Sequence, residues 1–280
     1  MAETTGIAWT DATWSPILGC SPASPGCTIC YALRDVWRMA HNPNPKIATP
    51  RQGLVEKTSA GVLRWTGKVS LLPDHLSVPL RWRKPRRIFV ANQADLFHEN
   101  VPADFVEQVF QVMSQASQHT FQLLTKRAER MRRVVFDFYE KQGVLQPLPN
   151  AWLGVSVEGR RERYRIHELE AAPAALRYLS LEPLLEDLGD LELAASRVDW
   201  VIVGGESGQR ARPCDPAWVR SIVAQCEAAG VPCFVKQLGS VWARSPRTND
   251  AYLLGGGHQA GADPEEWPDD LRVQQFPEVD

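Results

Sequence analysis

Residues 87–127, RIFVANQADLFHENVPADFVEQVFQVMSQASQHTFQLLTKR, contain the pattern that decides the fold. The apolar runs at 87–91 and 120–124 predict two strands that are buried on both faces, as in a parallel sheet. Between them, 102–118 has the apolar spacing of a helix, and Pro102 suits its first turn. A strand, a helix and a second strand in this order form the repeating unit of parallel α/β folds.

The same unit recurs over most of the chain. The segment 216–229 predicts a second helix, which ends at Gly230, and the shorter charged segment 159–172 predicts a third. An early strand at 7–14 brings the expected number of strands to eight. The remaining predicted strands are 68–72, 152–157, 177–181, 200–203 and 232–235. This number of units favours a TIM-like (β/α) barrel, complete or partly open, over its main alternative, a doubly wound open sheet.

The predicted organisation is one barrel domain and a C-terminal extension. We expect residues 1–238 to form the barrel, with a cysteine-rich loop at 19–31 after the first strand. Residues 239–280, which include three consecutive glycines at 255–257, predict a loop-rich extension packed on the barrel.

Composition excludes several classes of protein. The chain has 280 residues, of which 44% are hydrophobic and 23% charged, as in a globular domain and unlike a disordered chain. Its formal net charge of −2 argues against a surface that binds polyanions everywhere. No run approaches the roughly 18 apolar residues of a membrane span, and the first residues lack the apolar stretch of a secretory signal. We therefore expect a cytoplasmic protein without membrane contact.

The segment 13–32, TWSPILGCSPASPGCTICYA, places Cys20, Cys27 and Cys30 in a Cys-x6-Cys-x2-Cys pattern. Its glycines allow tight backbone turns, and its prolines stiffen the loop between the thiols. A helix that starts near Cys27 would direct free N–H groups toward the thiolates. A stiff loop with three thiols predicts a metal centre.

The number of ligands separates the candidate metals. Structural zinc takes four protein ligands, whereas three cysteines can hold three irons of a [4Fe–4S] cluster and leave the fourth iron open to a small molecule. We therefore expect an iron–sulfur cluster on Cys20, Cys27 and Cys30. Zinc with His41 or another distant residue as its fourth ligand, and a loop without metal, are the alternatives.

Polar side chains follow nearly every predicted strand. In a parallel barrel these positions meet at the carboxyl-terminal rim, where such folds place their active sites. Basic groups there suit an anionic substrate group such as a phosphate, and glutamates suit ribose hydroxyls or an ammonium group. The candidate catalytic residues are Asp95, Lys126, Arg127, Glu158, Glu182 and Lys236, with His98 and Gln237 beside them.

Three long motifs carry a resemblance to a known family: the cysteine segment at 13–32, WTGKVSLLPDHLSVPLRWRKPRRIFVANQADLFHE at 65–99 and DWVIVGGESGQRARPCDPAWV at 199–219. Through these motifs, nearly the whole chain up to about Gly239 resembles the phage Gp37/Gp68-like family, DUF5131. That family is similar to radical SAM enzymes, in which a three-cysteine [4Fe–4S] loop follows the first strand of a barrel. The resemblance implies S-adenosylmethionine as a second cofactor.

In radical SAM enzymes a Gly-Gly-Glu turn meets the amino group of that cofactor. The resemblance makes Gly204, Gly205 and Glu206 the candidates for this contact, although they lie far from the cysteine loop in the sequence. The sequence also departs from the commonest radical SAM pattern in the gap between its first two cysteines, which has six residues here and three in that pattern.

Three functions remain open from the sequence. We expect a radical SAM-like iron–sulfur enzyme that acts on an unknown, anionic or nucleotide-type substrate, with a protein partner as a further expectation. The alternative is a nucleic-acid-binding or structural protein whose loop is held by zinc or a cluster, as the basic stretch at 81–87 suggests. The third is a metal-independent hydrolase that uses Glu158, Glu182 or Glu206.

Overall fold

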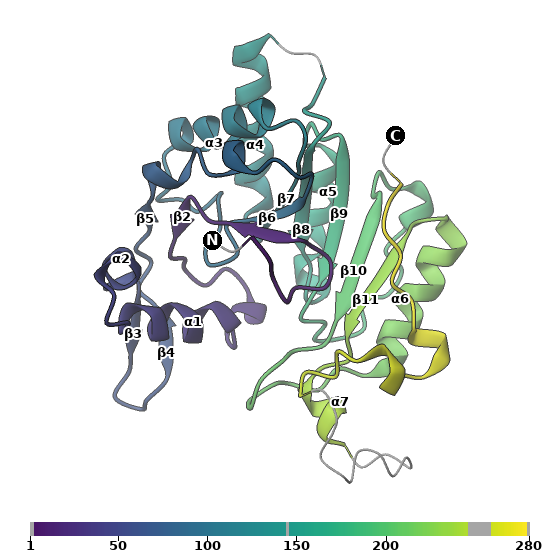
Figure 1. The fold of residues 1–280 in the computed structure, drawn as a ribbon. Coiled ribbons are helices and arrows are strands. Elements are labelled where there is room, and N and C mark those ends of the chain that lie inside the picture. The colour runs from purple at the N-terminus through teal and green to yellow at the C-terminus, as the bar shows by residue number, and fades with distance from the viewer. Residues whose placement is uncertain (1–2, 144–145, 246–258, 279–280) are drawn as a thin grey trace. The chain divides into compact units, whose positions relative to one another are not determined.

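The computed structural model describes residues 3–143, 146–245 and 259–278 (Figure 1). The chain divides into two compact units, the first formed by Met1–Val155 with Ala171–Leu176 and the second by Ser156–Glu170 with Arg177–Asp280. Parallel strands form the framework of both. They are β1 (Ala12–Trp14), β6 (Arg87–Val90), β7 (Thr120–Thr125), β8 (Ala151–Ser156), β9 (Leu176–Leu181), β10 (Trp200–Gly204) and β11 (Cys233–Gln237).

In the first unit, β1, β6, β7 and β8 pair in parallel, in that order. Helix α3 (Ala103–Gln115) follows β6, and α4 (Ala128–Gln142) follows β7. Helix α3 buries Phe105, Val109 and Met113, whose spacing places them on one face. The strand-helix-strand unit predicted from 87–127 is therefore confirmed.

Between β1 and β6 the first unit contains shorter elements. Helices α1 (Tyr31–Ala40) and α2 (Pro45–Ala48) lie in this segment with two antiparallel strand pairs. The pairs are β2 (Ile17–Leu18) with β5 (Ser70–Leu71), and β3 (Val55–Lys57) with β4 (Leu63–Trp65). Buried side chains of α1 join an apolar cluster with members of β2, β3 and β4, and Cys20 and Cys30 pack against it.

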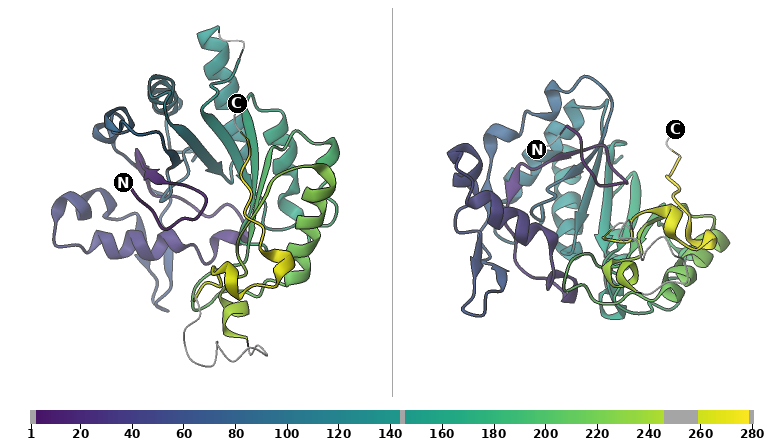
Figure 2. Two further views of the ribbon diagram at one scale, coloured as in Figure 1. Left: turned by 45° about the vertical axis from the view of Figure 1, so that its right-hand side comes forward. Right: turned by 60° about the horizontal axis from the view of Figure 1, so that its bottom comes forward.

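In the second unit, β10 pairs in parallel with β9 and with β11. Helix α6 (Pro216–Ala229) lies along β10 and β11 (Figure 2), and the unit also contains α5 (Tyr164–Glu170) and α7 (Ser240–Arg244). The Asp215 carboxylate accepts the Ala217 N–H at 2.8 Å and caps α6, which ends at Gly230 in a left-handed conformation. The prediction for 216–229 is confirmed to the residue.

The expected C-terminal extension runs beside β11. The Val235 N–H donates to the Val273 carbonyl at 2.8 Å, and Phe234 and Gln274 form an antiparallel bridge. This pairing covers part of an edge of β11 that would otherwise expose unpaired backbone groups. The glycines at 255–257 lie outside the described residues.

The TIM-like barrel prediction is wrong. The described parallel strands number seven, and their order β1-β6-β7-β8-β9-β10-β11 is that of an open sheet. The predicted strand at 68–72 is only the two-residue β5, which is half-exposed and pairs antiparallel with β2, so it supplies no parallel barrel strand. The order nevertheless follows the chain without the reversal of a doubly wound sheet, so the succession of units resembles that of a barrel.

Candidate functional site

The cysteine loop begins where β2 ends. At Gly19 the backbone has φ +90°, and any side chain there would collide with the Lys68 carbonyl. The Gly19 N–H donates to the Gln93 carbonyl at 3.2 Å, which ties the start of the loop to the residues that follow β6. At the other end, the Tyr31 hydroxyl donates to the Asn92 carbonyl at 2.6 Å. Both ends of the loop are thus attached at the carboxyl end of β6.

The three thiols of the loop are free and half-buried. Cys20 follows β2, Cys27 ends a short 3-10 helix, and Cys30 is the N-cap residue of α1. Burial, with the nearby Asp95 carboxylate, raises the pKa of the Cys20 thiol to about 12. Burial also raises the pKa of Cys30, although N–H groups at the start of α1 and the ammonium of Lys126 oppose the shift. The charge of Cys27 raises both pKa values, so the three thiols lie within electrostatic reach of one another.

The predicted metal centre is wrong. Among residues 3–143, 146–245 and 259–278, no group of three or more Cys, His, Asp or Glu side chains is placed to hold a metal ion. The prediction of a [4Fe–4S] cluster is therefore wrong, whereas S-adenosylmethionine binding and radical SAM chemistry stay predictions.

His41, the proposed fourth ligand for zinc, lies at the opposite end of α1 from Cys30. Its Nδ1 is 2.8 Å from the Trp37 carbonyl oxygen. A helix of ten residues is about 15 Å long, so His41 does not join the thiols.

Arg127 connects the cysteine loop to the end of β7. Its guanidinium donates to Asp95 at 3.0 Å and to Glu99 at 2.8 Å. It also donates to the Ser21 hydroxyl and carbonyl oxygens at 2.7 and 3.1 Å and to the Cys20 sulfur at 3.8 Å. Although burial favours the neutral form, these carboxylates raise the pKa of Arg127 above its ordinary value. The guanidinium therefore holds the loop in place and its donors are engaged within the chain.

Asp95 is fully occupied by hydrogen bonds. One carboxylate oxygen accepts from the Thr125 hydroxyl at 2.7 Å and the Phe97 N–H at 3.0 Å, and the other accepts from the Lys126 N–H at 3.3 Å and from Arg127. The buried Asp95 carboxylate thus joins the residues that follow β6 to the end of β7, and its catalytic role stays a prediction.

Ser21 and His98 form a hydrogen bond of 2.9 Å that sequence reasoning missed. The Asn100 N–H donates to His98 Nδ1 at 3.1 Å, so Nε2 carries the proton and donates to the Ser21 hydroxyl. Burial, followed by the charge of Arg127, lowers the pKa of His98 and keeps it neutral. Since this imidazole donates to Ser21, it cannot take the hydroxyl proton, and the pair is not a nucleophile with its base. Ser21 and Glu99 contact Arg127 only in the folded chain, so the sequence alone did not identify them as part of this site.

The three predicted glutamates lie in the second unit, where they follow β8, β9 and β10 and each has its own partner. Glu158 is buried in an ion pair with Arg165 at 3.0 Å. Arg212 donates to both carboxylate oxygens of the buried Glu206, at 2.9 and 2.6 Å. Each carboxylate is thus held by a cation of its own chain.

Glu182 is the glutamate of this group that solvent reaches. Lys236 donates to its two oxygens at 2.7 and 2.9 Å, and Gln237 donates at 3.1 Å. The side chains of Lys236 and Glu182 are 23% and 16% exposed. Of the predicted acid–base candidates in the second unit, this pair is the more accessible.

Gly204 and Gly205 have a packing role. A Cβ at Gly205 would lie 2.6 Å from the Leu238 carbonyl oxygen, and one at Gly204 would lie 3.1 Å from the Gln237 carbonyl oxygen. The absence of side chains lets β10 approach the backbone that follows β11. The cofactor-binding role that the resemblance implied stays a prediction.

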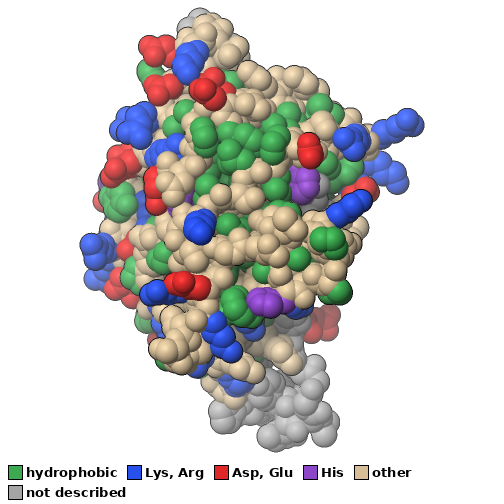
Figure 3. All heavy atoms as spheres, turned by 90° about the vertical axis from the view of Figure 1, so that its left-hand side faces the viewer, with side chains coloured by type: hydrophobic (Ala, Val, Ile, Leu, Met, Phe, Trp, Pro, Cys, Tyr) green, Lys and Arg blue, Asp and Glu red, His purple; other side chains and the backbone are tan. Residues whose placement is uncertain are grey.

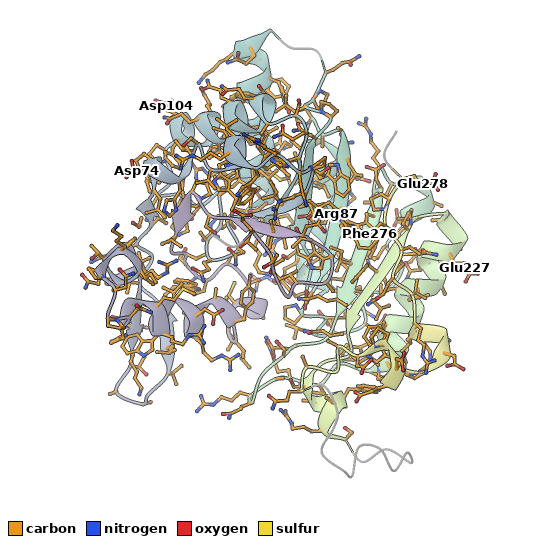
Figure 4. The ribbon with its side chains drawn as sticks, viewed as in Figure 1. Asp74, Arg87, Asp104, Glu227, Phe276 and Glu278 are labelled. Carbon is orange, nitrogen blue, oxygen red and sulfur yellow. The ribbon has the colours of Figure 1, made fainter. Side chains whose placement is uncertain are left out.

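The basic stretch at 81–87 is partly engaged within its own chain, and nucleic-acid binding stays a prediction. Trp82 is buried, and the Arg86 guanidinium lies over its ring at 5.4 Å. Arg86 pairs with Glu3, and Arg87, labelled in Figure 4, pairs with Asp11. On the face drawn in Figure 3, basic side chains are dispersed among acidic and apolar ones.

No helix in the described part of the chain combines the length and apolar character needed to cross a bilayer.

Comparison with known proteins gives one match. No curated protein and no solved structure matches the chain. A family model described as "Protein of unknown function (DUF5131)" matches residues 4–267, and this description mentions neither a phage protein nor radical SAM chemistry. Because the match spans nearly the entire sequence, the chain belongs to the DUF5131 family.

Proposed function

We propose that this protein is a thiol–disulfide oxidoreductase in which Cys27 and Cys30 are the redox-active pair. The observation that carries the proposal is the turn at residues 28–29, which joins the two cysteines immediately before α1. A turn brings the Cα atoms of its first and fourth residues within about 7 Å, a range that includes the separations found in disulfides. The backbone between the two cysteines is therefore compatible with a disulfide.

Backbone donors support thiolate chemistry at both sulfurs. The Ala23 N–H donates to Cys27 Sγ at 3.4 Å, and the N–H groups of Ala32 and Leu33 act to lower the pKa of the Cys30 thiol. Such donors stabilise the negative charge that a reacting thiolate carries. The loop that presents them is fixed at the carboxyl ends of β6 and β7, the side of a parallel sheet on which ligands bind.

The two cysteines differ in their surroundings, and this difference assigns their roles. Cys30 packs against the apolar cluster beneath α1, and burial raises its pKa, whereas Cys27 is not a member of that cluster. We therefore assign the attack on a substrate to Cys27 and the second step to Cys30.

The reaction is an exchange of disulfide bonds. The Cys27 thiolate attacks one sulfur of a substrate disulfide, the substrate S–S bond breaks, and the leaving thiolate takes a proton from solvent. Cys30 then loses its proton to solvent and attacks Cys27 Sγ, and the second substrate thiol leaves. The protein dithiol loses two electrons and two protons, and the substrate disulfide gains both. An external thiol reductant returns the protein to the dithiol form.

Trapping the mixed disulfide tests this assignment. We expect reduced Cys30→Ser protein, treated with oxidised glutathione, to accumulate glutathione on Cys27, because the second thiol is missing. The wild-type chain should instead form the Cys27–Cys30 disulfide, and Cys27→Ser should form neither product at this pair. Peptide mapping by mass spectrometry identifies each species.

Cys214→Ser is the matched control, since that cysteine is buried in the second unit and should not change the products. A disulfide between Cys20 and Cys27 in the wild-type chain would contradict the assignment, and so would a stable glutathione adduct on wild-type Cys27.

The earlier hypotheses lack an observation of this kind. The anionic or nucleotide-type substrate, a protein partner and nucleic-acid binding stay predictions. The hydrolase hypothesis also stays a prediction, and Glu182 with Lys236 is the pair on which it would now depend.

A further inference from the structure

We propose that Arg51 and Gln93 form a binding site for an oxyanion group of a small ligand, either a carboxylate or a phosphate. Both residues belong to the first unit, and the site is independent of the thiol chemistry proposed above. It is built around a partly buried cation whose partners within the described chain are all uncharged.

Arg51 ends a short 3-10 helix, Thr49–Arg51, which follows α2 and packs against α1. Its side chain is half-buried, and its Nη1 donates to the Ile47 carbonyl at 2.8 Å. Its Nη2 donates to the side-chain oxygen of Gln93 over a longer distance of 3.4 Å. A guanidinium carries more N–H donors than these two contacts use, so Arg51 retains donors for a ligand.

The charge of Arg51 is also uncompensated. Burial lowers the pKa of its guanidinium, and no carboxylate of the described residues acts against that shift. Its Nε is buried and has no hydrogen-bond partner in the same part of the chain. Because burying a cation without a counter-charge is unfavourable, an anion bound to Arg51 would stabilise the folded chain.

Two other partly buried arginines of the first unit differ in this respect. Arg127 donates to the carboxylates of Asp95 and Glu99. Arg130 donates to three backbone carbonyls, and the same two carboxylates act to raise its pKa. Arg51 has one carbonyl and one long contact to an amide, so its environment is that of a binding group and not of a structural ion pair.

Gln93 gives the site a second donor and a connection to the cysteine loop. Its Nε2 contacts the Met39 sulfur at 3.7 Å, and a thioether is only a weak acceptor. Its backbone carbonyl accepts the Gly19 N–H at 3.2 Å, immediately before Cys20. A ligand held by Arg51 and Gln93 would therefore be bound next to the start of this loop.

Lys68 adds positive charge to the same segment. Its Nζ lies 4.0 Å from the position that a Cβ of Gly53 would take, and Gly53 is two residues beyond Arg51. Glu56, the next acidic residue along the chain, is already paired with Arg64 at 2.5 Å. The surroundings of Arg51 therefore favour an anionic ligand over a neutral one.

Two simple probes test the site. The full chain is titrated calorimetrically with sodium phosphate and with sodium succinate, while sodium chloride keeps the ionic strength constant. We expect saturable binding of at least one probe and an unfolding temperature that rises with its concentration, because a ligand that binds only the folded chain stabilises it. Binding of phosphate alone would support a phosphate group, and binding of succinate alone a carboxylate. Binding of neither probe would overturn the proposal.

Arg51→Met separates a binding role from a structural one. Methionine removes the uncompensated charge, so the unfolding temperature without probe should stay equal or rise, whereas the affinity for the probe should fall at least about tenfold. Arg51→Lys keeps the charge but loses the fork of donors, so its affinity should lie between those of Arg51→Met and the wild type.

Arg38→Met is the matched control, because it removes an exposed arginine of α1 that is paired with Asp35. It should bind the probe as the wild type does. Undiminished affinity in Arg51→Met would overturn the proposal, and so would an equal loss of affinity in Arg38→Met. A lower unfolding temperature of Arg51→Met with unchanged affinity would show that Arg51 is a structural residue.

Discussion

At the scale of single residues, Arg127 has the most consequential set of contacts in the first unit. Its side chain is only 12% exposed, and that of its partner Asp95 only 7%. A buried cation is stable only when its charge is balanced and its donors are satisfied. Asp95, Glu99 and Ser21 meet both needs, which explains why a charged side chain lies beneath a loop of thiols.

Removing this side chain should therefore destabilise the protein strongly. We expect Arg127→Ala to lower the free energy of unfolding by about 3–5 kcal/mol, because Asp95 is left as a buried, unbalanced carboxylate. Arg127→Lys keeps the charge but loses the fork of donors, so its cost should be smaller. Urea denaturation measures both, and a loss below about 1 kcal/mol for Arg127→Ala would show that Asp95 is satisfied in another way.

At the scale of elements, the cysteine loop depends on a close approach between two backbone segments. Gly19 has φ +90° and leaves no room for a Cβ beside the Lys68 carbonyl. Gly67 has a similar φ of +81°, but a Cβ there would have no atom within 4 Å. An alanine at Gly67 therefore measures the loss of stability from backbone strain alone, whereas an alanine at Gly19 adds the loss from the collision with Lys68.

We expect Gly67→Ala to cost about 1–2 kcal/mol, the strain of a left-handed conformation. Gly19→Ala should cost about 1–3 kcal/mol more, because Lys68 must also move. It should further speed the alkylation of Cys20 by iodoacetamide, as the start of the loop is displaced. Equal losses of stability in the two variants would mean that the close approach at Gly19 is not required.

At the scale of the whole molecule, parallel strands organise each unit, and in the second unit the C-terminal residues also pair with β11. Residues 273–275 run beside β11, and the Trp200 indole N–H donates to the Gln275 carbonyl at 2.9 Å. The Phe276 ring, labelled in Figure 4, packs against Trp200 and Phe234 at centroid distances of 5.5 and 5.2 Å. The end of the described chain is thus part of the core of this unit.

Phe276→Ala should therefore destabilise the second unit. Truncating a fully buried phenylalanine to alanine lowers the free energy of unfolding by about 3–5 kcal/mol. Because Phe276 is half-buried, we expect a loss of about 2 kcal/mol. Phe136 on α4 is 55% exposed and serves as the control, for which Phe136→Ala should stay within about 0.5 kcal/mol. Thermal unfolding of both variants measures the difference, and equal shifts would show that Phe276 contributes no core packing.

The sequence by itself determined many of the local elements and the presence of three thiols in one loop. Apolar runs predicted β6, β7 and β10, and the spacing before Gly230 predicted α6, because burial on a strand and on a helix leaves different periodicities. Only the tertiary structure decided whether the sheet closes and whether the three thiols form a metal site. Closure depends on distances between strands far apart in the chain, and coordination depends on where the three thiols point. Periodicity contains no information about either. The same reason explains why Ser21 and Glu99 were recognised only through Arg127, which lies more than a hundred residues beyond Ser21.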